Sequence, residues 1–227
     1  MRFRQIKQEI AGLLMTDDFQ ESLEIICSFG LNKAISPLIS LFNSRDELQR
    51  WRAVSGLGFV TTRLATSEME SARVVMRRLM WMLNDESGGI GWGAPEAMGD
   101  ITARHQGLAD EYARILISYL NPSGNYLEHP MLQRGLLWGL ARLAHARPEH
   151  TQKATDCLQP FLVSADPIHR GLAAWTLAAQ QDSTVQTRLA PLRADHSPIT
   201  VYWGYTLQVC TVSQLTKKST RSPENPC

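Results

Sequence analysis

The stretch Ala34-Ile35-Ser36-Pro37-Leu38-Ile39-Ser40-Leu41-Phe42, followed after a polar turn by Arg50-Trp51-Arg52-Ala53-Val54-Ser55-Gly56-Leu57-Gly58, decides the fold. In the first part, apolar residues recur at spacings of three and four, which is the pattern of one buried helix face. The second part ends on small residues around Leu57, so a neighbouring helix can approach closely. We therefore predict two helices joined by a turn.

Weaker copies of this unit recur along the chain at intervals of roughly 30–45 residues, a period that indicates stacked helix pairs. Several second helices open with a proline in the first turn, where its missing amide costs nothing, and Ser44 with Glu47 forms a potential capping box. Ser197-Pro198 is interpreted as one of these helix starts. We predict about six helix pairs, with boundaries uncertain by two to four residues and no strands. The predicted pairs span residues 3–29, 31–63, 68–104, 107–145, 148–180 and 183–213.

Composition narrows the class of protein. A hydrophobic fraction of 44% over 227 residues supports one sizeable domain, predicted at residues 1–215, with a disordered tail at 216–227. The formal charge of +1 makes nucleic acid an unlikely partner, although the lysines of the tail leave a weaker nucleic-acid hypothesis open. No apolar run reaches the roughly 18 residues that a membrane span requires, so we expect a soluble, cytoplasmic protein. Cys27, Cys157 and Cys210 are expected to be reduced helix residues.

Residues 33–60 resemble a HEAT repeat of the short bacterial and archaeal kind, also called the PBS-lyase HEAT-like repeat. The motif there is Pro-Leu-x-x-Leu-Leu, a turn, and Val-Arg-x-x-Ala-x-x-Ala-Leu-Gly, and residues 169–178 are a second good match. The resemblance implies an all-α, right-handed α-α superhelix (a HEAT-like or armadillo-type solenoid) whose second helices line a concave face. It also implies binding of partner proteins on that face.

The segment from Asn84 to Asp100 is the least expected part of the chain. Four of its glycines fall within six residues, and each costs about 1 kcal/mol relative to alanine inside a helix. One interpretation is a long turn entering a kinked helix, with Pro95 inside that helix. The other is a site where a partner approaches closely, with Trp92 as its anchor, or where a small anion binds helix-start amides.

Arginines and tryptophans recur on the predicted second helices. The resemblance implies that Arg52, Arg134 and Arg170 bridge adjacent repeats through a turn aspartate, with Asp46, Asp85 and Asp166 as candidates. They could instead receive carboxylates from a partner. Tryptophans on a concave face would serve as interface anchors, and Trp51 and Trp92 are the best candidates. The predicted partner-binding residues are Trp51, Arg52, Gly89, Trp92, Glu96, Asp100, Arg134, Trp138 and Arg170.

No motif marks a reaction. The six histidines are dispersed and none precedes a glutamate, unlike the iron-binding pairs of HEAT-repeat hydroxylases, so neither a metal site nor a catalytic residue is predicted. We expect a non-enzymatic scaffold without a cofactor that binds a protein or peptide. The alternative is an enzyme or lyase-like subunit that holds a small ligand or cofactor near residues 88–100, which a closed pocket with converging polar groups would favour.

Overall fold

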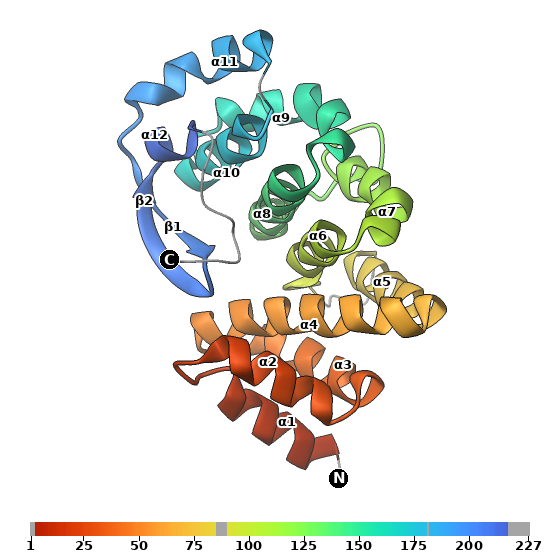
Figure 1. The fold of residues 1–227 in the computed structure, drawn as a ribbon. Helices are drawn as coiled ribbons and strands as arrows, with labels where there is room; N and C mark the ends of the chain where they lie inside the picture. Colours follow the sequence, from red (N-terminus) through yellow and green to blue (C-terminus); the bar gives the residue numbers. More distant parts are fainter. Residues whose placement is uncertain (1–2, 85–89, 181, 218–227) are drawn as a thin grey trace.

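A computed structural model describes residues 3–84, 90–180 and 182–217 of the chain. Through residue 178 these residues form successive helix pairs that curve into a solenoid (Figure 1). Five of the six predicted pairs are therefore confirmed, with boundaries shifted by a few residues. The pairs are α1 (Phe3–Leu13) with α2 (Phe19–Ser28), α3 (Leu31–Ser40) with α4 (Glu47–Ser67), α5 (Met69–Leu83) with α6 (Ala94–Arg104), α7 (Gln106–Ser118) with α8 (Pro130–Ala146), and α9 (Thr155–Leu162) with α10 (Pro167–Ala178).

The second helices begin at side-chain caps. Asp166 accepts a hydrogen bond from the Ile168 amide at 2.9 Å and leaves Pro167 as the first residue of α10, as the sequence predicts. The capping box expected from Ser44 and Glu47 is wrong. Asp46 caps α4 instead, because its carboxylate reaches the Gln49 amide at 2.8 Å.

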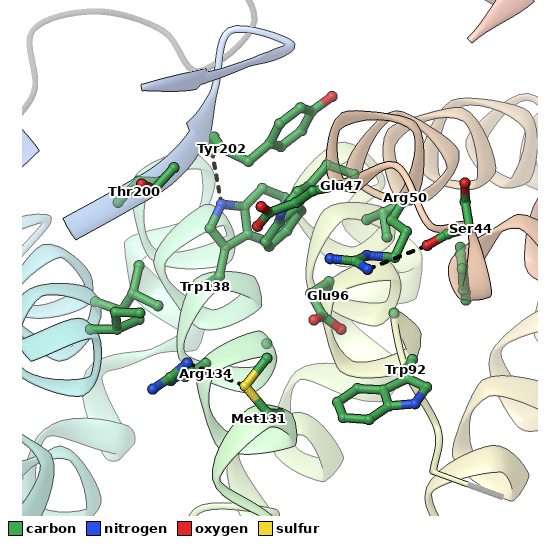
Figure 2. Close-up of a pocket in the computed structure, with 18 of the residues that line it drawn as sticks. Ser44, Glu47, Arg50, Trp92, Glu96, Met131, Arg134, Trp138, Thr200 and Tyr202 are labelled. Atoms are coloured by element: carbon green, nitrogen blue, oxygen red, sulfur yellow. Dashed lines mark hydrogen bonds between the residues drawn. The ribbon is translucent and has the colours of Figure 1, made fainter. Parts of the chain in front are cut away.

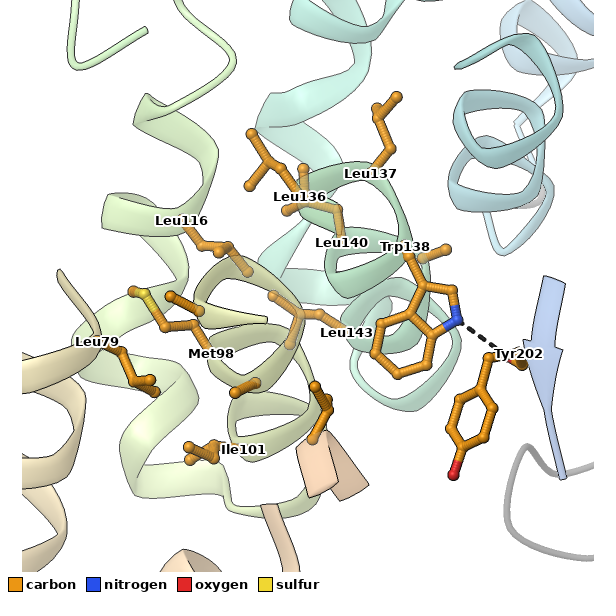
Figure 3. Close-up of a cluster of buried hydrophobic side chains, with 14 of the residues drawn as sticks. Leu79, Met98, Ile101, Leu116, Leu136, Leu137, Trp138, Leu140, Leu143 and Tyr202 are labelled. Carbon is orange, nitrogen blue, oxygen red and sulfur yellow. Dashed lines mark hydrogen bonds between the residues drawn. The ribbon is translucent and has the colours of Figure 1, made fainter. Parts of the chain in front are cut away.

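The helices α4, α6, α8 and α10 pack side by side in that order. Their closest approach is between α6 and α8, where a Cβ built on Gly99 would lie 2.1 Å from the Gly139 Cα. Larger residues fill the space around this crossing, and Figure 3 shows Met98, Leu136 and Leu140 in the resulting core. The small residues of the repeats thus permit close helix packing, as predicted.

The sixth predicted helix pair and the absence of strands are wrong. The chain continues as α11 (Ser183–Leu189) and a 3-10 helix η4 (Ala190–Ala194), and then forms an antiparallel hairpin of β1 (Pro198–Trp203) and β2 (Thr206–Thr211), followed by α12 (Val212–Leu215). Ile199 and Val201 are buried and alternate with exposed Thr200, which is the period of a strand. The two-residue turn at Gly204 and Tyr205 has positive φ at both positions, as a tight hairpin turn requires. Cys210 accordingly lies in a strand rather than in the predicted helix.

The hairpin lies across the concave face and joins distant parts of the solenoid (Figure 1). The Tyr202 hydroxyl is 3.0 Å from Ser55 Oγ on α4, and the Tyr202 carbonyl accepts a hydrogen bond from Trp138 Nε1 on α8 at 2.9 Å. At the hairpin turn, the Tyr205 carbonyl accepts a hydrogen bond from Arg52 Nε at 3.1 Å. A C-terminal segment therefore braces the N-terminal repeats.

Within the described residues, no helix is both long and apolar enough to cross a membrane.

Candidate functional site

A pocket of about 350 Å³ lies between β1 and the N-terminal turns of α4, α6, α8 and α10 (Figure 2). Each helix contributes residues from its start, for example Arg50 from α4, Glu96 from α6, Arg134 from α8 and Ile168 from α10. The hairpin packs over later turns of the same helices, where residues such as Ser55 and Trp175 lie against it. The pocket thus lies at the helix starts, and Val54 and Trp138 from later turns of α4 and α8 also line it.

Aromatic rings form one wall of this pocket. Trp51 stacks on Tyr202 with ring centroids 5.2 Å apart and planes 11° apart, and its centroid lies 4.7 Å from that of Trp138. On another side, Trp92 meets His129 edge-to-face at 5.4 Å. Apolar surface and a few polar groups are thereby combined in one concavity, which is typical of ligand sites.

Glu96 is a carboxyl of the pocket with a strongly shifted pKa. Its Oε2 is buried and has no hydrogen-bond partner. Desolvation by burial raises the pKa of this carboxyl to about 7, although its own backbone amide and the charge of Arg50 act in the opposite direction. The carboxyl fits against α8 because residue 135 is glycine: a Cβ there would lie 2.2 Å from Glu96 Oε1.

Arg50 faces the same hollow from α4, and Figure 2 shows its guanidinium beside the Glu96 carboxyl. Its hydrogen bond to protein runs from Nη1 to the Ser44 carbonyl at 3.3 Å. The part of the chain that the structure describes contains no ion pair of Arg50 with Glu96, so their N–O separations exceed 4.0 Å. A cationic and an acidic group therefore line the pocket without pairing.

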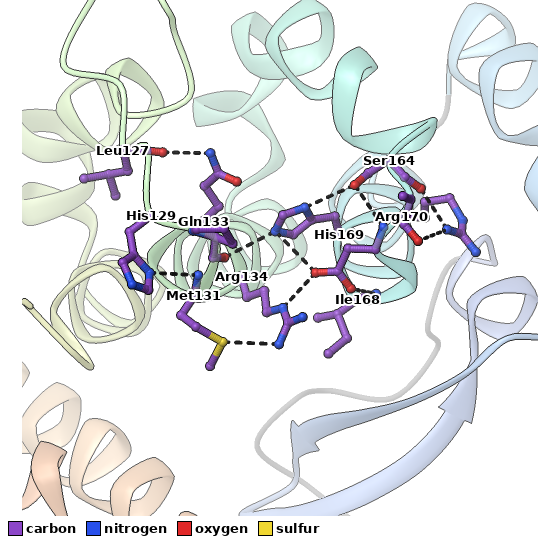
Figure 4. Close-up of polar contacts among 12 residues, drawn as sticks. Leu127, His129, Met131, Gln133, Arg134, Ser164, Ile168, His169 and Arg170 are labelled. Atoms are coloured by element: carbon purple, nitrogen blue, oxygen red, sulfur yellow. Dashed lines mark hydrogen bonds and ion pairs between the residues drawn. The ribbon is translucent and has the colours of Figure 1, made fainter.

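Arg134 bridges two repeats through a turn aspartate, as the resemblance implied (Figure 4), whereas Arg170 joins the last helix pair to the loop before β1. Arg134 Nε donates to Asp166 Oδ2 at 2.8 Å, and Arg170 Nε donates to Asp195 Oδ2 at 2.8 Å. Arg52 has no such aspartate partner: Nη1 donates to the carbonyls of Leu14 and Thr16, at 2.9 and 2.8 Å. Asp46, one of the candidate partners, caps α4 instead, and Asp85, another candidate, lies outside the described residues.

Asp100 lies beneath the hairpin and is 1% exposed. Its carboxylate accepts hydrogen bonds from Arg104 Nε at 2.7 Å and from Arg142 Nη2 at 2.7 Å. Desolvation raises the pKa of this carboxyl, but the two guanidinium groups outweigh it, and the net pKa is lowered. A Cβ on Gly58 would meet Asp100 Oδ2 at 2.1 Å, so the repeat glycine makes room for this ion cluster.

The pocket brings together five of the predicted site residues: Trp51, Trp92, Glu96, Arg134 and Trp138. Three others do not line it, because Arg52 and Arg170 bind carbonyl groups or carboxylates of the fold and Asp100 lies in the buried ion cluster. Gly89 falls outside the described residues. The assignment of any of them to partner binding stays a prediction.

The described part of the glycine-rich segment, from Ile90 to Gly93, forms a turn that enters α6, as one interpretation predicted. Gly93 has φ +74° and precedes the helix, and a Cβ there would lie 2.6 Å from the Phe42 ring. Pro95 is in the first turn of α6, so its expected place inside a helix is wrong. This tight approach sets both Trp92 and Glu96 at the pocket.

Sequence reasoning missed Arg50, Gly135 and Tyr202 as pocket residues. The repeat motif contains Arg52 and not Arg50. Arg50 faces the concave side only because of the rotation of α4 about its axis, which the motif does not give. Gly135 carried a detectable signal, since a glycine one turn before Trp138 in a helix requires a packing reason. Tyr202 was placed on a helix, and the alternating β-branched and aromatic run 199–203 is the signal that identifies its strand.

Among the described residues, no group of three or more His, Cys, Asp or Glu side chains could hold a metal ion.

Comparison with known proteins identifies the architecture only. No family model and no curated protein matches the chain. A computationally designed armadillo repeat protein for modular peptide recognition matches with a TM-score of 0.51 and 14% identity over 95% of each chain. The fold is an armadillo/HEAT-type solenoid.

Two further structures resemble this solenoid less closely. A designed armadillo repeat protein in complex with the peptide (KR)4 has a TM-score of 0.46 and 18% identity over 82% of this chain and 87% of its own. An archaeal HEAT-like repeats protein from Thermococcus onnurineus NA1 has a TM-score of 0.38 and 17% identity, over 92% and 77%.

Proposed function

We propose that this solenoid is a non-enzymatic binding module that holds a segment of a partner protein on its concave face. One residue of that segment inserts into the pocket between β1 and the starts of α4, α6, α8 and α10. The observation that carries the proposal is the buried Glu96 carboxyl, which lines this pocket beside Arg50 and has an unpartnered oxygen. Buried polar atoms in folded proteins normally have partners, and an unpartnered one requires an explanation.

The architecture supports this proposal in two ways. A designed protein of the same fold was made for modular peptide recognition. The pocket of about 350 Å³ is also large enough for one bulky side chain with part of its backbone, and it is too small for a folded domain. A segment lying across the helix starts would place one residue in the pocket and the rest along the rim.

The experiment is selection from random peptide libraries displayed with free N-termini or free C-termini. Enriched peptides are then measured on wild type, on Trp92→Ala and on Trp81→Ala, a matched control because Trp81 is 75% exposed on α5 and does not line the pocket. We expect Trp92→Ala to weaken binding by about 2 kcal/mol or more and Trp81→Ala to leave it unchanged. Equal affinity for folded Trp92→Ala and wild type would refute the site.

A second candidate function is binding of a small organic molecule. The pocket has converging polar groups and an aromatic wall, the arrangement that would favour this alternative. Native mass spectrometry of the protein mixed with a metabolite library distinguishes the two. A small molecule retained by wild type and lost from Trp92→Ala, together with failure of every peptide selection, favours the small-ligand function.

A further inference from the structure

The starts of four consecutive second helices meet at the pocket. Glu47, Gly93, Met131 and Ile168 line it from the first turns or caps of α4, α6, α8 and α10. Each helix start carries a partial positive charge from the aligned peptide dipoles. Asp46, His129 and Asp166 accept hydrogen bonds from first-turn amides of α4, α8 and α10, and the two carboxylates offset part of that charge, whereas α6 begins at Gly93 without a side-chain cap. The start of α6 therefore contributes most to a field that favours a negatively charged group in the pocket.

Arg50 adds a full positive charge to this field. Its guanidinium has five N–H donors, and the described structure shows one hydrogen bond from it, to the Ser44 carbonyl at 3.3 Å. The remaining donors lie at a pocket wall. Arg134, the other arginine that lines the pocket, donates a hydrogen bond from Nε to Asp166 Oδ2 at 2.8 Å. Arg50 is therefore the group best placed to bind an anion.

Glu96 reinforces this preference when it is protonated. Burial favours its neutral form, and a neutral carboxyl can donate its O–H to an acceptor in the pocket. A ligand carboxylate between Arg50 and Glu96 would accept from both groups. A ligand ammonium group would instead be repelled by Arg50. It would also need the ionised form of Glu96, which burial disfavours.

The aromatic wall requires an apolar group within a few ångströms of that carboxylate. Trp51 and Tyr202 are stacked beside Trp138, and Trp92 lies on another side of the hollow. An aspartate or glutamate side chain supplies a carboxylate without an apolar companion. The C-terminal residue of a protein chain supplies both, because its α-carboxylate and its side chain branch from one Cα.

We propose that the pocket binds the C-terminal residue of a partner chain, with the free α-carboxylate held by Arg50 and Glu96 and an apolar side chain against the tryptophans. This inference rests on the proposed function and specifies which part of the partner segment enters the pocket.

The test uses short synthetic probes and protein labelled with 5-fluorotryptophan, followed by fluorine NMR. The primary probe is acetyl-Gly-Phe with a free carboxylate, and its matched control is the same dipeptide as the C-terminal amide. Acetyl-Gly-Glu-amide tests an acidic side chain, and acetyl-Gly-Lys-amide tests a cationic one. Resonances of Trp51, Trp92 and Trp138 report on the pocket, and exposed Trp81 is the internal control.

We expect the free carboxylate to shift the pocket resonances and the amide to bind at least about tenfold more weakly, because charge-assisted hydrogen bonds are lost. Arg50→Met should weaken the carboxylate probe by a similar factor, and Arg50→Lys should restore part of the loss. Glu47 is exposed at the pocket and repels an anion, so Glu47→Gln should tighten binding by about twofold.

The dependence of affinity on pH tests whether Glu96 acts as a neutral hydrogen-bond donor or as an ionised carboxylate. If its neutral form donates to the ligand, affinity falls as pH rises above the free pKa of about 7, by up to about tenfold per unit. Glu96→Gln keeps an N–H donor and should bind with flat pH dependence. The other charged groups that line the pocket are Glu47 and Arg50 on α4 and Arg134 on α8, with His129 beside Trp92. A slope that persists in Glu96→Gln would refute the role of Glu96.

Four outcomes would overturn the inference. They are equal binding of the carboxylate and the amide, tightest binding of the lysine probe with loss in Glu96→Gln, binding of the glutamate side-chain probe as tight as that of the free terminus, and absence of pocket shifts with all probes. Library peptides that still bind at Trp92 through an internal residue would leave the proposed function intact. Failure of both the probes and the library peptides would remove both proposals.

Discussion

Replacing Gly99 with alanine tests whether the crossing of α6 and α8 organises the solenoid. The added Cβ would lie 2.1 Å from the Gly139 Cα and 2.5 Å from its carbonyl carbon, whereas carbon atoms in contact are normally about 3.5–4.0 Å apart. The obstacle is backbone, so no side-chain rotation relieves it and the helices must separate by more than about 1 Å. Helix propensity favours alanine by about 1 kcal/mol, and overpacking costs about 1–3 kcal/mol or more.

We expect Gly99→Ala to lower the free energy of unfolding by about 2 kcal/mol, measured by urea denaturation followed by far-ultraviolet circular dichroism. Gly12→Ala is the matched control, because a Cβ on Gly12 in α1 meets nothing within 4 Å. That variant should gain up to about 1 kcal/mol from helix propensity alone. A Gly99→Ala protein as stable as wild type would refute the reasoning, because it would mean that the two helices are not in close contact.

Three further predictions concern buried polar groups. Asp100→Asn should destabilise the fold by about 3–5 kcal/mol, because it breaks a buried ion cluster. Since the folded-state pKa of Asp100 is lowered, wild type should lose this stability as pH falls through that pKa. The acid denaturation curve of the variant should therefore be flatter than that of wild type. Glu96→Gln should show the opposite pH effect. The pKa of Glu96 is raised to about 7, so wild type loses stability as pH rises from about 4.3 to about 7, by at most about 4 kcal/mol, and denaturation at about pH 8 should find the glutamine variant more stable. Tyr202→Phe removes the hydrogen bond to Ser55 and should cost about 1 kcal/mol, with faster amide hydrogen exchange in the hairpin than in α6; unchanged hairpin exchange would show that the bond does not brace it.

The predictable part of the fold is the part that repeats. Each helix pair carries its own apolar spacing, turn and start signal, so local chemistry suffices to place α1 to α10 within a few residues. Residues 198–211 do not repeat this unit. Their strand pattern is only six residues long on each side, and the preceding Ser197-Pro198 imitates a helix start, so repeat periodicity extended the helical prediction into the hairpin.

Some residues of the candidate site are likewise visible in local sequence patterns, and others are not. The second-helix pattern identifies Trp51 and Trp138, because a tryptophan in a repeat frame is visible without knowledge of its neighbours, and the glycine-rich segment identifies Trp92, which lies in the turn before α6. Arg50 has no distinctive local pattern, and Asp100 cannot be distinguished from a surface residue in the sequence. Its burial arises because Gly58 on α4 and two arginines, one on α6 and one on α8, surround it.

The sequence by itself determined the repeat and five helix pairs, because these depend on contacts between residues close in the chain, and the resemblance implied a concave face lined by the second helices. Only the tertiary structure decided what covers that face. The hairpin reaches Ser55 and Arg52 across about 150 residues of chain, and no local pattern encodes a contact at that separation. By packing over the middle turns, it leaves the helix starts open as a pocket and places Tyr202 beside Trp51.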